Sequence, residues 1–438
     1  MDAREAALKI LAGSEQDGAK SDELLSDELS YPGLKPIDRG LLKELVSGVL
    51  RNRSRLDFIL DGSLKKGVGS LTVWERNILR LGLYQIAHLD RIPQSAAVNE
   101  SVKLAKRFSR PGTIGLTNAI LRDIIRNRQW TKPLDITDSY EKLSVEYSHP
   151  EWLVRKWLDQ IGIDETDALL EANNRPAPVT IRVNRLKTSA DALFHVLEAS
   201  GFEPRRNALA GTALDLGNPA GLIESEPFRW GLFYIQDAAA QVVSQIATVS
   251  PGQRALDLCA APGGKLTAFA EMTGDDGLII GVDIGQQKIA RIRENLRRLG
   301  VRLVRLVCAD AATFTSRKRF DLVLADVPCS GLGVLRRRMD LRWRIGPDDI
   351  PRLAALQAAI LGNAATLVEP GGRLIYSTCT LTPEENEQQI SRFLERHSEF
   401  KSVKPGLPDS MLSGSFLYLW PHRHQSDGAF AACLEKMR

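Results

Sequence analysis

Ala255-Leu256-Asp257-Leu258-Cys259-Ala260-Ala261-Pro262-Gly263-Gly264-Lys265 is the stretch from which the fold can be predicted. Its apolar start ends in an acid and indicates a buried parallel strand, and the segment from Leu266 to Met272 has the pattern of a helix. A strand, a glycine turn and a helix N-terminus form the ligand-binding corner of a doubly wound sheet. A tight structural turn is the alternative, because the spacing matches neither the dinucleotide motif nor a P-loop.

From Phe233 onward, strand and helix patterns alternate, as in a parallel α/β sheet. We expect strands at 278–282, 303–308, 320–325 and 373–377, and helices at 287–299 and 351–368. The segments 415–420 and 428–435 are expected to pair as an antiparallel hairpin. The sequence therefore predicts an α/β domain over residues 233–438.

Two further regions precede this domain. Residues 1–130 are predicted to be all helical, because apolar residues recur at three- and four-residue steps and Thr72-Val73-Trp74-Glu75 is a capping box. We expect this region to bind a partner or serve as a scaffold, and arginines on its polar faces make a nucleic-acid surface the alternative. Residues 131–148 lose the periodicity and are predicted to be a linker. Residues 149–232 mix both patterns and indicate a small α+β domain.

The composition is that of an ordinary globular protein. The 438 residues are 43% hydrophobic and 26% charged, and the net charge of +4 permits a polyanionic partner without requiring one. The acidic start does not resemble a secretion signal, and no window approaches the roughly 18 consecutive apolar residues of a membrane helix. The five cysteines form no metal-binding spacing. We therefore expect a cytoplasmic protein with reduced thiols, no metal and no membrane attachment.

Acidic residues follow three of the predicted strands, at the edge where such sheets bind ligands. Asp283 comes 20 residues after Gly263, the usual offset for an acid that binds ribose hydroxyls, and Asp310 could reach an adenine edge. Metal ligands and a cationic clamp for a triphosphate are not evident, so we expect S-adenosylmethionine. The predicted cofactor residues are Cys259, Ala260, Ala261, Pro262, Gly263, Gly264, Lys265, Asp283, Asp310 and Asp326.

Two cysteines stand in polar, turn-forming contexts directly beyond a predicted strand. Cys329 lies in Asp326-Val327-Pro328-Cys329-Ser330-Gly331, and Cys379 lies in Tyr376-Ser377-Thr378-Cys379-Thr380. Two such thiols at one ligand edge suggest covalent chemistry. Cys308 and Cys433 are instead expected to be small buried apolar residues.

The loop at 258–265, the Pro-Cys motif and Ser377-Thr378-Cys379 together resemble the RNA cytosine-C5 methyltransferases of the Sun type. The helical region is similar to the NusB-like domain of the Fmu/RsmB branch, which methylates small-subunit ribosomal RNA. Gln236-Asp237, Pro383-Glu384-Glu385-Asn386 and Asp427-Gly428 support the resemblance, and Val327 and Ala238 are conservative departures. The resemblance implies a Rossmann-like methyltransferase domain, S-adenosylmethionine and 16S rRNA as a partner, and we expect a monomer.

The resemblance also implies roles for the catalytic residues. The Thr-Cys cysteine of the family attacks cytosine C6 and the Pro-Cys cysteine assists product release, so these roles fall to Cys379 and Cys329. Asp326 would hydrogen-bond the base and stabilise charge on its ring, and Lys265 would orient groups in the pocket or assist Asp326. The target base must leave its stack to be reached. DNA cytosine-C5 methyltransferases attack with the Pro-Cys cysteine, so this assignment rests on resemblance alone.

A run of arginines follows the Pro-Cys motif, from Arg336 to Arg344. Basic residues interleaved with a tryptophan suit phosphate contacts and base stacking, and an exposed charged loop is the alternative. The predicted RNA contacts are Arg336, Arg337, Arg338, Arg342, Trp343 and Arg344. Arg182 and Asn184 are candidates for substrate contact on the resemblance alone.

Three alternatives to 16S rRNA methylation stay open at this point. The first is the same chemistry on tRNA or large-subunit rRNA. The second is a non-catalytic RNA-binding or ribosome-assembly factor, which the retained cysteines, Asp326 and full glycine loop disfavour. The third is a methyltransferase for proteins or small molecules, which is disfavoured because methyl transfer to N or O needs no thiol nucleophile.

Overall fold

The computed structural model describes residues 2–29 and 35–438. The chain divides into two compact units, Met1–Asn174 with Arg337–Ile345 (unit 1) and Arg175–Arg336 with Gly346–Arg438 (unit 2). Within the described ranges, no helix is both long enough and apolar enough to cross a membrane.

Unit 1 is built from helices. They are α1 (Ala3–Gln16), α2 (Ser21–Leu29), α3 (Pro36–Arg51), α4 (Arg53–Asp61), α5 (Val73–His88), α6 (Gln94–Phe108), α7 (Thr113–Asn127), α8 (Ser139–Glu146), α9 (Glu151–Asn174) and α15 (Leu341–Arg344). The apolar core of its N-terminal part is formed by the segment from α1 to α7. Thr72 caps α5 through the predicted capping box, in which the Glu75 carboxylate accepts from the Thr72 backbone N–H. The helical prediction for the N-terminal region is therefore confirmed.

The structure differs from the predicted boundaries after residue 130. Helix α8 lies inside the predicted linker, and α9 belongs to unit 1 although it was expected in the small domain. Helix α8 has eight residues, of which only Ser144 and Val145 are buried, too few to produce a visible apolar period. Gly162 interrupts α9 with a φ of +77°, which explains why its two halves look like separate helices in the sequence.

Unit 2 begins with a small antiparallel sheet of strand order β2-β3-β1-β4. Its elements are β1 (Val179–Val183), α10 (Ala190–Ala199), β2 (Pro204–Arg206), β3 (Ala213–Leu216), α11 (Glu226–Arg229) and β4 (Phe233–Ile235). Leu193 and Leu197 of α10 pack with Ile181 and Phe233 of the sheet. This part is the small α+β domain.

A second sheet of unit 2 has the strand order β11-β12-β13-β9-β8-β5-β6-β7, with β10 beside β13. Its strands are β5 (Arg254–Asp257), β6 (Leu278–Asp283), β7 (Val304–Cys308), β8 (Phe320–Asp326), β9 (Val368–Thr378), β10 (Phe400–Val403), β11 (Leu412–Ser413), β12 (Phe416–Leu419) and β13 (Ala429–Lys436). Strands β5 to β9 are parallel. Strand β13 is antiparallel to β9 and β12, which confirms the predicted terminal hairpin.

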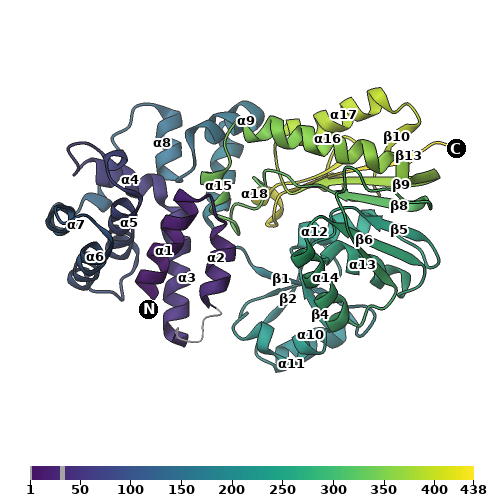
Figure 1. Cartoon of the computed structure of the whole chain (residues 1–438), viewed down its shortest axis with the longest axis horizontal. Coiled ribbons are helices and arrows are strands. Elements are labelled where there is room, and N and C mark those ends of the chain that lie inside the picture. The colour runs from purple at the N-terminus through teal and green to yellow at the C-terminus, as the bar shows by residue number, and fades with distance from the viewer. Residues whose placement is uncertain (1, 30–34) are drawn as a thin grey trace. The chain divides into compact units, whose positions relative to one another are not determined.

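Helices cover both faces of this sheet, so the doubly wound fold class is confirmed (Figure 1). One face carries α12 (Ala238–Ile246), α13 (Gly264–Thr273) and α14 (Gln286–Leu299), and the other carries α16 (Asp349–Leu367) and α17 (Glu387–Arg396); α18 (Pro421–His424) is a short connecting helix. The parallel strands all end at one edge of the sheet. Asp257, Asp283, Cys308, Asp326 and Thr378 are their last residues, so the predicted site residues gather there.

Candidate active site at the carboxyl edge of the parallel strands

The glycine loop joins β5 to α13 and passes over the end of the sheet. Gly263 caps α13 with a φ of +102°, a conformation that favours glycine, and a Cβ at this position would lie 3.3 Å from Ile292. Below the loop, Asp257 is buried and accepts from the backbone N–H of Cys259 at 3.3 Å. Burial, and next the charge of Asp326, raise the pKa of Asp257 to about 7. Sequence reasoning used Asp257 only as a strand end and missed this buried acid.

Asp283 lies directly beside the loop. Its Oδ2 accepts from the backbone N–H of Ala261 at 3.1 Å, and its Oδ1 lies 3.2 Å from Nζ of Lys288. Asp310 is exposed just beyond β7, where its carboxylate accepts from the backbone N–H of Ala312 at 2.9 Å. The structure therefore brings Asp283 against the loop and places Asp310 beyond the next strand.

Asp326 joins two neighbours at the end of β8. It forms an ion pair with Nζ of Lys265 at 2.6 Å and accepts a hydrogen bond from Oγ of Ser377 at 2.6 Å. Burial opposes the charge of Lys265, but Asp326 outweighs it and holds the pKa of Lys265 above its ordinary value. Lys265 also interacts electrostatically with Cys379, so a cation stands beside one of the two candidate thiols.

The two cysteines meet. Sγ of Cys329 lies 3.2 Å from Sγ of Cys379, and the backbone N–H of Cys379 donates to Sγ of Cys329 at 3.3 Å. The hydrogen bond with Cys379, together with burial, raises the pKa of Cys329 well above its ordinary value. Cys329 is therefore the sulfur that holds its proton more tightly than an ordinary thiol, and the charge of Lys265 acts on Cys379.

Cys379 lines a cavity of about 170 Å³ within unit 2. Lys265 and Asp326 line it with Cys379, and Asp237 and Asp427 belong to the same lining. A sulfur, a cation and carboxylates therefore line a cavity of the size of one small ligand. Gly333 donates its backbone N–H to the carbonyl of Cys379 at 3.0 Å, and a Cβ there would lie 2.8 Å from that oxygen, so glycine permits this close approach.

The residues that follow the two cysteines are tied together by a fully buried carboxylate. Oγ of Ser330 and Oγ1 of Thr380 lie 2.6 Å apart. Glu385 accepts from the backbone N–H of Ser330 at 2.9 Å, from its hydroxyl at 2.6 Å, and from the Thr382 hydroxyl at 2.6 Å. Nε2 of Gln357 donates to Glu385 at 2.8 Å. Glu385 thus holds both cysteine loops. In the sequence it was only part of a supporting motif, because Ser330 and Gln357 are distant from it along the chain.

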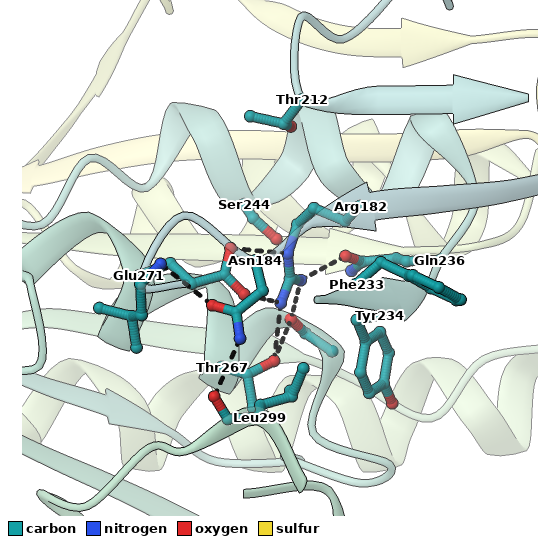
Figure 2. A network of polar contacts seen from close by, with 12 residues as sticks. Arg182, Asn184, Thr212, Phe233, Tyr234, Gln236, Ser244, Thr267, Glu271 and Leu299 are labelled. Carbon is teal, nitrogen blue, oxygen red and sulfur yellow. Dashed lines mark hydrogen bonds and ion pairs between the residues drawn. The ribbon is translucent and has the colours of Figure 1, made fainter. Parts of the chain in front are cut away.

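Arg182 of β1 supports the glycine loop from inside (Figure 2). Its guanidinium donates to the carbonyl of Gly264, donates to Oγ1 of Thr267 at 2.8 Å and pairs with Glu271 at 2.7 Å. Gln236 accepts a further hydrogen bond at 2.5 Å. Arg182 is only 3% exposed, so it links the small sheet to the cofactor loop and does not face substrate.

Asn184, just beyond the end of β1, is also an internal tie. It is fully buried, and its Nδ2 donates to the carbonyl of Gly231 at 2.8 Å and to that of Leu299 at 2.9 Å. The suggestion that Arg182 and Asn184 touch substrate is therefore corrected, since both side chains are enclosed by protein partners.

The arginine run divides between the two units. In unit 2, Arg336 is buried and pairs with Asp427 at 2.8 Å and with Asp237 at 3.4 Å. In unit 1, Arg342 is fully buried and donates to the carbonyl of Ser148 at 3.1 Å. This burial corrects the expectation that Arg336 and Arg342 contact RNA, because an enclosed guanidinium offers no surface to a phosphate.

The other members of the run are partly buried. In unit 1, Nε1 of Trp343 donates to the carbonyl of Leu50 at 2.7 Å, and the ring packs against the helical core. Arg344 pairs with Asp340 at 3.0 Å. RNA contact by Arg337, Arg338, Trp343 and Arg344 stays a prediction.

The remaining cysteines differ in their surroundings. Cys433 is buried, as predicted, but Cys308 is exposed, and the prediction for it was wrong. Cys308 is the last residue of β7, which is an edge strand, so no second strand covers its outer side. Cys259 is half-buried in the loop, where burial and the nearby Asp257 raise its pKa. Over the described ranges, no three His, Cys, Asp or Glu side chains form a group that could hold a metal ion.

Known families cover each part of the chain. Residues 245–435 match the 16S rRNA methyltransferase RsmB/F family, residues 1–126 match the NusB family, and residues 149–222 match the ferredoxin-like domain of RsmF/B-like methyltransferases. A Bacillus subtilis (strain 168) protein named probable ribosomal RNA small subunit methyltransferase B is 35% identical over 99% of this chain and 98% of its own. This chain belongs to the RsmB/F family.

Two further relatives agree with this membership. A Synechocystis protein (strain ATCC 27184 / PCC 6803 / Kazusa) with the same name is 38% identical over 99% of both chains. The crystal structure of PH0851 superimposes with a TM-score of 0.83 at 27% identity and covers 100% of this chain and 99% of its own.

Methyltransferases of the RsmB/F family use S-adenosylmethionine, and the residues at the strand edge fit this cofactor. Asp283 would hold the ribose hydroxyls and Asp310 the adenine amino group, with the glycine loop beside them. Lys265 and Lys288 lie at this edge, but each is paired with an acid. The edge therefore suits a cofactor without a polyphosphate. When bound, S-adenosylmethionine supplies an electrophilic methyl group.

Proposed function

We propose that this protein methylates C5 of a cytosine in 16S rRNA through a covalent bond between Cys379 and C6 of the base. The cysteine pair carries the proposal, because two sulfur atoms 3.2 Å apart beside a cation suit covalent catalysis. The names of the curated relatives support small-subunit rRNA as the substrate. The resemblance to cytosine-C5 methyltransferases supports the position on the base.

The attack begins at Cys379. Cytosine C5 is a weak nucleophile, but addition of the Cys379 thiolate to C6 moves the C5–C6 double-bond electrons to C5, which can then accept the methyl group. Lys265 favours the thiolate through its charge. Asp326, held by Lys265 and Ser377, would hydrogen-bond the N3/N4 edge of the base and stabilise charge that builds on the ring.

Product release falls to Cys329. The C5 proton must leave and the C6–sulfur bond must break, and the electrons of the C5–H bond then restore the ring double bond. Cys329 keeps its proton and lies within reach of the departing sulfur. It would protonate Cys379 as the bond breaks, and the Cys329 thiolate so formed would take the C5 proton. Cys329 is then a thiol again, and Cys379 is released as a thiol that gives one proton to solvent before the next attack.

The target nucleotide would enter the cavity alone. A cavity of about 170 Å³ encloses one base and not a stacked duplex, so the target base would leave its stack. A cytoplasmic location and a monomeric state stay predictions.

The proposal is tested by incubating the protein with labelled S-adenosylmethionine and unmodified 16S rRNA, with tRNA and 23S rRNA in parallel. We expect transfer into 16S rRNA, and bisulfite sequencing should map 5-methylcytosine at a specific site. Transfer into another RNA supports the alternative substrate. A methyl group on nitrogen or on a ribose oxygen contradicts the covalent route, and transfer into none of the RNAs contradicts catalysis.

A further inference from the structure

One segment of unit 2 is strongly basic. Residues 286–305, which span α14 and the start of β7, contain seven Lys and Arg residues and one acid, Glu294. This segment has a net charge of +6, whereas the whole chain has +4, so the remaining residues together carry −2. The location of these cations therefore matters more than the mild overall charge.

Helix α14 places its cations on the face opposite the core. Ile289, Ile292, Leu296 and Leu299 are buried against the sheet. Four exposed arginines, Arg291, Arg293, Arg297 and Arg302, lie on α14 and in the turn that follows it, and we name them the α14 basic face. Among the described residues, none of these four guanidinium groups has an ion-pair or hydrogen-bond partner. Clustered arginines without acidic partners suit a polyanion.

Helix α14 lies next to β4 of the small sheet (Figure 1), and its first turn follows Asp283 at the carboxyl end of β6. Lys288 in the first turn of α14 pairs with Asp283, and Asn295 donates to the carbonyl of Pro262 in the glycine loop at 3.1 Å. At the other end, Lys187, Arg297 and Arg302 line an open groove of about 730 Å³. Fourteen helical residues span about 21 Å, enough for several nucleotides of an extended strand.

An exposed tryptophan stands at the groove end. Trp230 is 58% exposed, and its carbonyl accepts from Nζ of Lys187, which also lines the groove, at 2.6 Å. The next residue, Gly231, packs directly against α14, because a Cβ there would lie 2.0 Å from the carbonyl oxygen of Arg298. An exposed aromatic ring beside unpaired arginines is typical of surfaces that bind single-stranded nucleic acid by stacking and charge.

We propose that the α14 basic face and Trp230 bind a single-stranded segment of the substrate RNA next to the target nucleotide, the arginines through phosphates and Trp230 through one base. This inference rests on the proposed function, because it assigns a surface to the same substrate. The arginine run at 336–344 offers fewer RNA contacts than the sequence predicts, because Arg336 and Arg342 are held by internal partners. The α14 basic face supplies exposed arginines in their place.

The test compares two triple variants of the full chain. Arg291→Gln with Arg293→Gln and Arg297→Gln removes three charges from the α14 basic face. The matched control, Arg392→Gln with Arg396→Gln and Lys401→Gln, removes three exposed charges from α17 and β10. Affinity for a single-stranded 16S rRNA fragment is measured by fluorescence anisotropy at several salt concentrations.

We expect the α14 variant to lose affinity about tenfold or more, and its slope of log K against log salt to fall by about 2, at about 0.7 per lost phosphate contact. The control should bind like wild type. Unchanged affinity and slope in the α14 variant, or equal losses in both variants, overturn the inference.

A second measurement tests the stacking role. Trp230→Ala should weaken RNA binding about fivefold or more, and Trp230→Phe should retain most of it. Equal binding by Trp230→Ala and wild type overturns the role of Trp230. S-adenosylmethionine affinity, measured by calorimetry, should be unchanged in every variant, which separates RNA loss from misfolding.

The two proposals fail in different ways. If wild type binds RNA through this face but transfers no methyl group, the proposed function fails and the surface stands. If wild type methylates 16S rRNA and the α14 variant does so with the same kcat/KM, the surface is wrong and the function stands.

Discussion

Cys329 and Cys379 place their sulfur atoms 3.2 Å apart although they are 50 positions apart in the chain. Each cysteine follows a parallel strand, β8 or β9, and these strands are neighbours in the sheet. The register pairs Asp326 with Ser377, so the loops that leave these residues start side by side. The sheet register, together with the Glu385 network, therefore builds the cysteine pair.

Lys265→Met should shift the pH dependence of the reaction. Removing the cation beside Cys379 disfavours its thiolate, so the rise of kcat/KM with pH should move upward by about one unit or more. At neutral pH the rate should fall about tenfold, and part of it should return at higher pH. Lys265→Arg keeps the charge and should stay closer to wild type. A loss that is uniform across pH would contradict this role for Lys265.

Arg182→Met should weaken cofactor binding as well as stability. The change leaves the Glu271 carboxylate buried without its cation, and breaking a buried pair costs about 3–5 kcal/mol. It also leaves the Gly264 carbonyl with the Thr267 hydroxyl as its remaining side-chain donor. We expect a lower Tm and weaker S-adenosylmethionine binding by calorimetry.

Adding Glu271→Met to Arg182→Met provides the control for the Arg182 prediction. The double variant has no unpaired buried carboxylate, so it should recover much of the Tm. It still lacks the donor to Gly264, so cofactor affinity should stay low. Full recovery of affinity would show that Arg182 supports the fold and not the loop.

Glu385→Gln should slow turnover. The amide keeps only one acceptor oxygen. It therefore cannot accept both at the Oε1 position, where the Ser330 backbone N–H and Gln357 donate, and at the Oε2 position, where the Ser330 and Thr382 hydroxyls donate. The two cysteine loops should then be less well aligned, and kcat should fall about tenfold or more while KM for S-adenosylmethionine changes little. Glu395→Gln removes the same charge from an exposed position of α17 and is the control. Equal kcat values for the two variants would rule out the positioning role.

Local patterns predicted the elements and the corner of the site, because strand and helix periods and a glycine turn act over short stretches. These patterns are enough to assign Asp283, Asp326 and Cys379 to one edge of the predicted sheet. Whether a polar side chain is buried or exposed depends instead on partners that are distant along the chain. Arg336 is buried because Asp427, 91 positions away, accepts its hydrogen bond. Nothing near Arg336 in the sequence distinguishes it from an exposed arginine.

The exposure of Cys308 at the edge of the sheet could not be predicted from the sequence either. Cys308 lies in an apolar stretch like the strands of the sheet interior, but β7 is an edge strand, and strand order is a property of the whole sheet. The α14 basic face could have been found by counting charge along the chain. The structure shows which side of α14 packs against the sheet and therefore which of its arginines are exposed.

Asp257→Asn should change how stability depends on pH. The pKa of Asp257 is about 7 in the folded protein, whereas an unfolded aspartate titrates near about 3.9. Between these values the folded state holds a proton that the unfolded state lacks, so wild-type stability falls as pH rises. The asparagine keeps an acceptor for the Cys259 N–H and does not titrate.

Denaturant unfolding at about pH 5 and about pH 7 measures this effect. The free energy of unfolding of Asp257→Asn, minus that of wild type, should increase by up to about 3 kcal/mol between these values. A difference that is the same at both pH values would mean that Asp257 is ionised throughout.

In the proposed mechanism, Cys379 forms the bond to the RNA and Cys329 releases it. Wild type, Cys379→Ala and Cys329→Ala are incubated with labelled S-adenosylmethionine and 16S rRNA, and the products are separated on a denaturing SDS gel. Cys379→Ala should show neither methyl transfer nor a covalent complex, and Cys329→Ala should accumulate an SDS-resistant protein–RNA complex. The opposite pattern would contradict the division of roles, and methyl transfer by Cys379→Ala at the wild-type rate would contradict covalent catalysis by this cysteine.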